Sequence, residues 1–148
     1  MLQILSMTNE HREDVLSMMR VFYASPAVAT NGSEEIFQAD IDACVGDSPY
    51  AEGFVFDSGG ALAGYAMIAK SFSTEYGVPC IWIEDIYLMP EFRNKGIGSQ
   101  FFAYLEEKFP GHLFRLEAEE ENLPALHTYR KNGFTQMPYI EMKKASPV

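Results

Sequence analysis

The sequence predicts a single α/β or α+β domain that spans residues 1–148. Three observations support this fold class. The length is enough for one domain with one hydrophobic core. Hydrophobic residues make up 47% of the chain, which is typical of a globular protein rather than a disordered one. The apolar periodicity predicts a strand, two helices, three strands, a helix, a strand, a helix and two strands, with no internal repeat or linker.

The first third of the chain predicts a strand followed by two helices. Residues 2–7 have strand character, and Thr8-Asn9 offers an N-cap for the first helix. Ser25-Pro26 ends that helix, and Ser33 caps a second helix over residues 34–46. The apolar faces of these helices are formed by Val15, Leu16, Met19, Phe22 and Tyr23 in the first, and by Phe37, Ile41 and Cys44 in the second.

Three strands are predicted next. Residues 52–57 and 61–71 are joined by Ser58-Gly59-Gly60, which is a hairpin signal, and Gly64 indicates a bulge or a close backbone approach. Residues 81–88 form a third strand that is apolar on both faces, as expected for a central strand covered on both sides. Strict alternation places Trp82, Ile86 and Leu88 on one face, and Ile81, Ile83 and Tyr87 on the other.

Two adjacent acids, Glu84 and Asp85, interrupt this apolar strand. An unpaired carboxylate in such a place is costly, so two of them call for a reason. One explanation is chemistry. The structural alternative is that one acid pairs with an arginine while the other caps a backbone N–H group.

A basic, glycine-bearing loop follows the strand. It reads Arg93-Asn94-Lys95-Gly96-Ile97-Gly98, and a helix from Ser99 to Phe109 comes after it. The free N–H groups at a helix N-terminus and two cations predict a phosphate or pyrophosphate site. The dinucleotide fingerprint is absent because Phe101 occupies its third glycine position, and no P-loop pattern is present.

The last part of the chain predicts a strand at residues 112–118 and a short helix capped by Asn122. Pro124 suits the first turn of this helix, and Gly133 suits its C-terminal cap. Residues 134–137 and 139–144 are predicted to form a final pair of strands. Glu119 to Glu121 form a charge run, for which a solvated surface is the simpler interpretation, although the run could attract a cation.

Two motifs in this order resemble those of the GNAT superfamily of N-acetyltransferases. The R-x-x-G-x-G pattern of residues 93–98 resembles the acetyl-CoA pyrophosphate loop. Residues 122–134 match N-x-x-A-x-x-x-Y-x-x-x-G-F at every position. The resemblance covers essentially the full chain. It implies one GNAT-like domain whose central sheet is mixed but mostly antiparallel and flanked by helices.

The resemblance also implies where acetyl-CoA binds as cosubstrate. The backbone of Ile86, Tyr87 and Leu88 would pair with the pantetheine arm, and the Leu88 N–H would hold the oxyanion. Tyr129 would protonate the leaving thiolate. Asn122 could contact the coenzyme, although an ordinary N-cap is an equally good interpretation. The pyrophosphate would be bound by Arg93, Asn94, Lys95, Gly96, Ile97, Gly98 and Ser99.

Acetyl transfer to an amine needs a base, because an ammonium group has a pKa near ~10.4. Glu84 is the best candidate for that general base. The Glu-Asp pair also resembles, weakly, the central strand of diamine and polyamine acetyltransferases. By that match Asp85 would anchor the acceptor amine, which leaves open which of the two acids is the base. Tyr23, the 25–33 loop and Tyr139 would border the acceptor pocket.

The composition limits the classes of ligand and partner that the chain is expected to bind. The net charge of −10 argues against nucleic acid and is compatible with a cationic acceptor. Cys44 and Cys80 make no metal-binding spacing, and no metal is expected. The sequence is compatible with a disulfide between them, but free thiols in a cytoplasmic protein are the simpler interpretation. No apolar run approaches the ~20 residues needed to cross a membrane. GNAT enzymes are often dimers, so a homodimer is compatible with the sequence.

The predicted function is transfer of an acetyl group to a primary amine of a small molecule, by direct attack in a ternary complex. Polyamines or other cationic amines are favoured as acceptors. The alternatives are a non-catalytic acyl-CoA-binding or sensor module and a protein or peptide N-acetyltransferase. Intact Glu84 and Tyr129 argue against the sensor, since a module that only binds needs neither.

Overall fold

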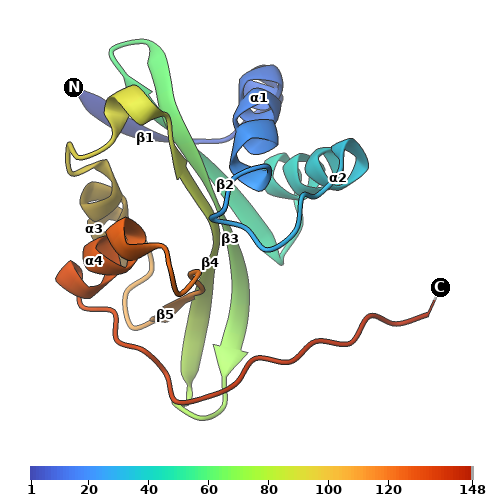
Figure 1. Cartoon of the computed structure of the whole chain (residues 1–148), viewed down its shortest axis with the longest axis vertical. Helices are drawn as coiled ribbons and strands as arrows, with labels where there is room; N and C mark the ends of the chain where they lie inside the picture. The colour runs from blue at the N-terminus through green and yellow to red at the C-terminus, as the bar shows by residue number, and fades with distance from the viewer. Residues whose placement is uncertain (148) are drawn as a thin grey trace.

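The computed structural model describes residues 1–147, which form one five-stranded sheet with α-helices on both faces (Figure 1). Two short 3-10 turns, η1 (Asn9–His11) and η2 (Pro90–Phe92), precede α1 and the loop to α3. The strands and helices are β1 (Leu2–Ser6), α1 (Arg12–Tyr23), α2 (Glu34–Val45), β2 (Ala51–Ser58), β3 (Ala61–Ser73), β4 (Val78–Leu88), α3 (Ile97–Lys108), β5 (Leu113–Leu116) and α4 (Leu123–Lys131).

The sheet has the order β1-β2-β3-β4-β5. The first four strands pair antiparallel in chain order, with α1 and α2 inserted between β1 and β2, and only β4 and β5 run parallel, with α3 as the crossover. This confirms the expectation of a mixed, mostly antiparallel sheet. Such a crossover needs a connection of a dozen or more residues, which α3 and its loops supply.

Two hydrophobic cores cover the two faces of the sheet. Helices α1 and α2 pack on one face, where Val15, Met19 and Ile41 are fully buried. Helix α3 packs on the other, around Phe101, and α4 joins it through the half-buried Tyr129. Strands β2, β3 and β4 contribute side chains to both cores, so β4 is covered on both faces, as the apolar pattern of residues 81–88 indicated.

Several local predictions are confirmed by the contacts. The Ser33 hydroxyl accepts a hydrogen bond from the Ile36 N–H at 3.2 Å, so it caps α2. A Cβ on Gly64 would collide with the Tyr87 carbonyl oxygen, so this glycine marks a close approach of β3 to β4. Cys44 and Cys80 are buried free thiols.

The predicted final strand pair is wrong. Residues 135–147 form no strand, and Figure 1 shows them as an extended tail that leaves the sheet. We call residues 135–147 the C-terminal tail. Strand propensity alone does not make a strand, because the ladder also needs a partner edge. Within residues 1–147, no helix is both long enough and apolar enough to cross a membrane.

Candidate functional site

A bulge in β4 places the two acids. Met67 of β3 faces Asp85, but the next residue, Ile68, faces Ile83, so Glu84 is an extra residue without a cross-strand partner. The bulge reverses the alternation at this point. Ile81 and Ile83 lie in the α3 core, whereas Asp85 and Tyr87 face α1. The predicted faces of β4 are therefore wrong for Ile81 and Ile83, because strict alternation assumes an unbroken ladder.

The outer edge of β4 is open beyond the bulge. Strand β5 pairs with β4 only from Cys80 to Ile83, and β4 continues alone to Leu88. The Met89 N–H bonds to Ala63 of β3, so the Leu88 carbonyl on the opposite side of that peptide points to the open edge, where it accepts from Arg93 Nε at 2.9 Å. Because the N–H and C=O of one strand residue point the same way, the Leu88 N–H also faces this edge.

The same geometry orients the backbone of Tyr87 differently from the backbones of Ile86 and Leu88. Its carbonyl oxygen is directed at Gly64 in β3, which turns its backbone away from the open edge. Ile86 and Leu88 alternate with Tyr87 and face outward. Backbone pairing with a ligand at this edge is thus available to Ile86 and Leu88 but not to Tyr87, whose ring instead lies under the Arg93 guanidinium at 5.6 Å.

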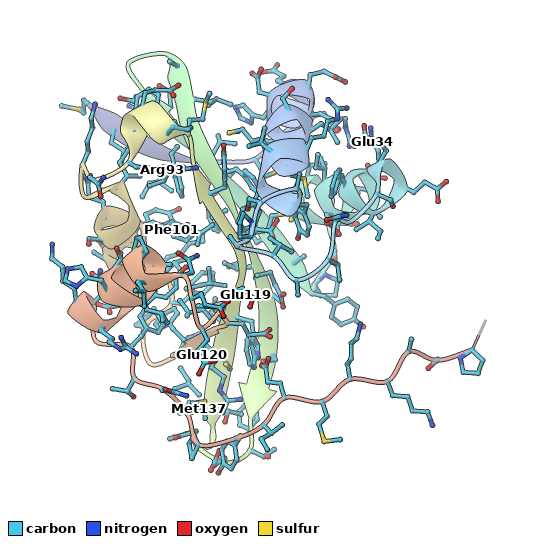
Figure 2. All side chains as sticks on the ribbon, viewed as in Figure 1. Glu34, Arg93, Phe101, Glu119, Glu120 and Met137 are labelled. Carbon is cyan, nitrogen blue, oxygen red and sulfur yellow. The ribbon has the colours of Figure 1, made fainter. Side chains whose placement is uncertain are left out.

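The loop from Arg93 to Gly96 turns the chain into α3 (Figure 2). Two left-handed positions on either side of Lys95 make the turn, Asn94 with φ 61° and Gly96 with φ 80°. The first hydrogen bond of α3 joins the Gln100 N–H to the Gly96 carbonyl at 3.0 Å. The three amides between those residues have no partner inside the helix, as is usual for a first helical turn.

Gly98 lies in this first turn, and the fold itself does not require a glycine there. Its φ is not positive, and a Cβ at this position would meet only Thr128 Cγ2 at 3.8 Å, an ordinary contact. The bare backbone therefore leaves room above the free amides. Arg93 and Lys95 are both exposed beside it. These features together suit a phosphate or pyrophosphate group.

Asp85 is buried, with 4% of its surface exposed, and two tyrosine hydroxyls bind it. Tyr23 of α1 donates to Oδ1 and Tyr65 of β3 donates to Oδ2, each at 2.8 Å. Burial raises the pKa of Asp85, while the two hydrogen bonds oppose that rise. Burial and the nearby carboxylate also raise the pKa values of Tyr23 and Tyr65, so both stay protonated donors.

Glu84 has the opposite environment, because it is exposed beside the open edge. Partial desolvation raises its pKa, and the charges of Asp85 and Glu141 add to the effect. Of the two acids, Glu84 is the accessible one, whereas both oxygens of Asp85 are already engaged. Glu84 is therefore the acid that a ligand can reach, whereas Asp85 is held in place by two tyrosine hydroxyls.

Further acids lie close to this pair. Asp40 of α2 is half-buried, and its pKa is raised to about 6, first by burial and then by the charges of Asp85 and Glu84. Glu117, just after β5, shares a hydrogen bond with Glu141, which raises the pKa of Glu117 to about 7. The acids therefore form one electrostatically coupled group near the bulge, which is repulsive without a cation.

The second motif lies on α4. The Asn122 side chain accepts from the Ala125 N–H at 3.4 Å, so it caps the helix. Tyr129 is half-buried, and its ring makes edge contacts with Phe102 and Phe134. Burial raises the pKa of Tyr129, which keeps its hydroxyl protonated at neutral pH. Asn132 Nδ2 donates to Ser99 Oγ at 3.0 Å and so ties the end of α4 to the first turn of α3.

The structure brings into contact Tyr23 and Asp85, which the sequence analysis assigned to the acceptor site, and it adds residues that the sequence did not single out. Tyr65 has the pattern of a core strand residue. Asp40 could have been found from the sequence, because it directly precedes the core residue Ile41. An acid at that position lies at the edge of the apolar face of α2. Glu117 and Asn132 gave no local signal, because their partners are distant in the chain.

The chain is similar to known acetyltransferases. Residues 15–134 match the model of the acetyltransferase (GNAT) family. The thialysine N-epsilon-acetyltransferase of Sus scrofa is 29% identical over 120 residues, which cover 74% of this chain and 68% of that protein. The streptothricin acetyltransferase of Streptomyces lavendulae is 38% identical over 79 residues, which cover 51% of this chain but only 39% of that protein.

Solved structures show the same fold. The aminoglycoside acetyltransferase AAC(6')-Iy, in complex with a bisubstrate analogue, aligns with a TM-score of 0.79 at 16% identity over 99% of each chain. The aminoglycoside antibiotic 6'-N-acetyltransferase AAC(6')-IG of Acinetobacter haemolyticus aligns with a TM-score of 0.76 at 16% identity, again over 99% of each chain.

Proposed function

Because the chain belongs to the acetyltransferase (GNAT) family, we propose that it is an acetyl-CoA-dependent enzyme that acetylates a primary amine of a small cationic molecule. The observation that carries this proposal is the pair of acids at the β4 bulge. Glu84 is accessible at the open edge, and Asp85 is held beside it by Tyr23 and Tyr65.

The residues around α3 fit acetyl-CoA. The free amides of the first turn, the bare backbone at Gly98 and the charges of Arg93 and Lys95 suit its pyrophosphate. The backbone of Ile86 and Leu88 offers hydrogen bonds to the pantetheine arm, as an edge strand does to an added strand. When bound, acetyl-CoA supplies an activated acetyl group as a thioester.

Glu84 takes up the proton that the acceptor amine must lose. An ammonium with a pKa near ~10.4 is about three units above neutral pH, so deprotonation costs about 4 kcal/mol. A positioned carboxylate supplies part of this cost, directly or through one water molecule. The Leu88 N–H donates to the thioester carbonyl oxygen, and Tyr129 gives a proton to the departing sulfur. Asn122 contributes mainly by capping α4, the helix that carries Tyr129.

The amine attacks directly in a ternary complex, with no covalent enzyme intermediate. The cysteines support this mechanism, because neither is suited to act as a nucleophile. Cys44 and Cys80 are both buried, and burial raises the pKa of Cys44 to about 12, which keeps it in the unreactive thiol form.

A cationic acceptor is favoured by the acids around the bulge. Asp40, Glu84 and Asp85 repel one another, and a second ammonium group on the acceptor would relieve that repulsion. Polyamines and aminoglycoside-like amines have this chemistry. The names of the relatives are compatible with it, since they state streptothricin, thialysine and aminoglycosides as acceptors.

The experiment that tests the proposal measures CoA release with acetyl-CoA and a panel of amines. The panel contains polyamines, aminoglycosides, amino acids and a peptide with a free N-terminus. Monoamines of the same chain length serve as controls for the need for a second charge. Release stimulated by a di- or polyamine, but weakly by its monoamine control, supports the proposal. Acetyl-CoA binding without release for any amine would favour the binding module, and release with the peptide alone would favour the peptide N-acetyltransferase.

A further inference from the structure

Arg115 of β5 is held in place by aromatic rings more than by hydrogen bonds. Its guanidinium carbon lies 5.5 Å from the centre of the Trp82 ring and 6.0 Å from the centre of the Tyr76 ring. Within residues 1–147, its Nε is a buried donor without a hydrogen-bond partner. Buried polar atoms of this kind are rare in native structures, and each calls for an explanation, such as a group that binds there.

The carboxylate that pairs with Arg115 does not satisfy it. The distance from Arg115 Nη2 to Glu75 Oε1 is 3.9 Å, which is longer than a hydrogen bond. The other oxygen of Glu75 accepts from the Tyr139 hydroxyl. The Arg115 side chain remains 21% exposed although its Nε is buried, so an incoming ligand would meet the two Nη groups. The guanidinium is therefore fixed and charged, with N–H donors still unused.

Arg115 lies on the same face of the sheet as the acids of the bulge. The residues on either side of it pack in the α3 core, so the alternation of a strand turns Arg115 to the opposite face. The residues on either side of Trp82 also belong to that core, which places Trp82 and then Glu84 on the Arg115 face. Helices α1 and α2 lie toward the other end of this face, away from the hairpin turn between β3 and β4 (Figure 1).

The spacing of the two charges suits one small ligand. Arg115 is the partner of Trp82 in the parallel ladder between β4 and β5, and Glu84 is two residues beyond Trp82. Two strand residues advance about 7 Å along the sheet. An amino acid of the size of lysine spans roughly 7 Å between its side-chain amine and its carboxylate when it is extended. A single ligand of this kind can therefore reach both Glu84 and Arg115.

The surrounding charges select a carboxylate that arrives together with ammonium groups. The planar fork of an arginine matches either a carboxylate or a phosphate. Glu75 lies beside the guanidinium, and Glu117 follows two residues after Arg115, so a doubly charged phosphate would be repelled. An amino acid with a side-chain amine carries one carboxylate and two ammonium groups. It remains a cation and meets both signs of charge in the site.

We infer that Arg115 determines acceptor specificity by binding a carboxylate, and that the acceptor is an α-amino acid with a primary amine on its side chain. This inference rests on the proposed function, because it names the acceptor class of the same site. The side-chain amine lies at Glu84, and the carboxylate lies on the Arg115 guanidinium. The α-ammonium group is next to the carboxylate and so comes within range of Glu75. A polyamine has no carboxylate and leaves Arg115 unsatisfied.

The test compares acceptors that differ at the carboxylate. L-Lysine and L-lysine amide carry the same two amines, but the amide lacks the negative charge, and cadaverine lacks the whole group. The wild type is expected to have a kcat/KM for lysine at least about 10-fold above that for lysine amide, because a charge-assisted hydrogen bond is lost with the amide. General attraction by the acids would give the opposite order, since the amide is the more cationic of the two.

Three variants assign the preference to Arg115. R115Q should raise the KM for lysine about 10-fold or more with kcat nearly unchanged, and should leave cadaverine within about twofold of the wild type. R115K keeps the charge without the planar fork, so it should lose part of the preference and serves if R115Q folds poorly. The control K108Q removes a positive charge from α3, on the other face of the sheet, and should keep the full preference.

Calorimetry on the complex with CoA measures acceptor affinity without turnover. Lysine that binds more tightly than lysine amide to the wild type, but equally in R115Q, supports the inference. Equal affinities in the wild type, or a preference that survives in R115Q, would overturn it, and CoA release with cadaverine would then leave the proposed function standing. Arg115-dependent binding of lysine with no release for any amine would support the carboxylate site and overturn the proposed function.

Discussion

The substitution Glu84→Gln removes the proposed base and leaves the shape of the side chain almost unchanged. Glu84 is exposed at the bulge and makes no hydrogen bond that holds the fold, so stability should change by less than about 0.5 kcal/mol. Binding of acetyl-CoA should also be retained, because the basic loop and the first turn of α3 lie elsewhere in the chain.

Turnover is the quantity that should fall. Deprotonation of the amine costs about 4 kcal/mol at neutral pH, and a general base typically contributes 10² to 10⁴-fold. Since Glu84 is exposed, and its proton transfer competes with water, we expect the lower half of that range, a drop in kcat of about 10² to 10³-fold. The deficit should shrink as the pH approaches the pKa of the amine, because the free amine then needs no base.

The assay is CoA release over a pH range with saturating acetyl-CoA and the best amine of the panel. Glu107→Gln, an equivalent change at an exposed position on α3, is the matched control and should keep full activity. Turnover in Glu84→Gln within twofold of the wild type at neutral pH would remove Glu84 from the mechanism. A deficit that stays constant up to high pH would point to substrate positioning instead of proton transfer.

Four further changes test other parts of the site. Gly98→Val should weaken acetyl-CoA binding at least about 10-fold by titration calorimetry while the protein stays folded, because only ligand space is filled. Gly64→Ala should cost about 3 kcal/mol in denaturant unfolding, since its Cβ would collide with the Tyr87 carbonyl. Tyr129→Phe should lower kcat only about 10-fold or less, because a thiolate with a pKa near ~8.5 leaves readily. Asp40→Asn should raise stability at neutral pH by about 1 to 2 kcal/mol while raising the KM for a diamine.

The sign of the Asp40 effect follows from its raised pKa. The folded state holds this proton up to about pH 6, whereas the unfolded state loses it near pH 3.8. The stabilising contribution is therefore fully present below pH 3.8 and is lost as the pH rises through about 6. Wild type and Asp40→Asn should be equally stable near pH 3.8 and diverge above it. Parallel stability curves for the two proteins would contradict this assignment.

The predictions for Gly98→Val, Gly64→Ala and Tyr129→Phe each have an outcome that would contradict them. Unchanged acetyl-CoA affinity in Gly98→Val would mean that pyrophosphate binds elsewhere. A fully stable Gly64→Ala protein would show that β3 and β4 separate readily where Gly64 faces Leu88. Loss of nearly all turnover in Tyr129→Phe, with binding intact, would make proton delivery to sulfur a limiting step.

Local signals in the sequence were sufficient for the elements as far as α4 and for the turn of the basic loop. Caps such as Ser33 and Asn122, the turn at Ser58-Gly59-Gly60 and the apolar periodicities act over a few residues, so they can be read along the chain. The same holds for the loop before α3, because the left-handed turn and the free amides follow each other directly. Gly64 inside a strand pattern indicated a bulge or a close backbone approach, and the structure shows the close approach to the Tyr87 carbonyl.

The environment of the two acids could not be predicted from local signals. The sequence placed Glu84 and Asp85 together, but only the ladder between β3 and β4 shows that Glu84 is the extra residue of a bulge. The hydrogen bonds from Tyr23 and Tyr65 join residues 62 and 20 positions away from Asp85. Such contacts depend on how α1 and β3 pack, which no local pattern contains.

The sequence by itself thus indicated the family and the candidate residues, and the tertiary structure decided which of these residues are exposed, buried or coupled to one another. Side-chain type and short spacing are properties of a few neighbouring residues, and they fixed the loop, the caps and the adjacent acids. Register, burial and charge coupling arise only when distant segments meet. They separate an exposed Glu84 from a buried Asp85, add Asp40 to the acids, and leave the C-terminal tail, which has the sequence of a strand, without a strand to pair with.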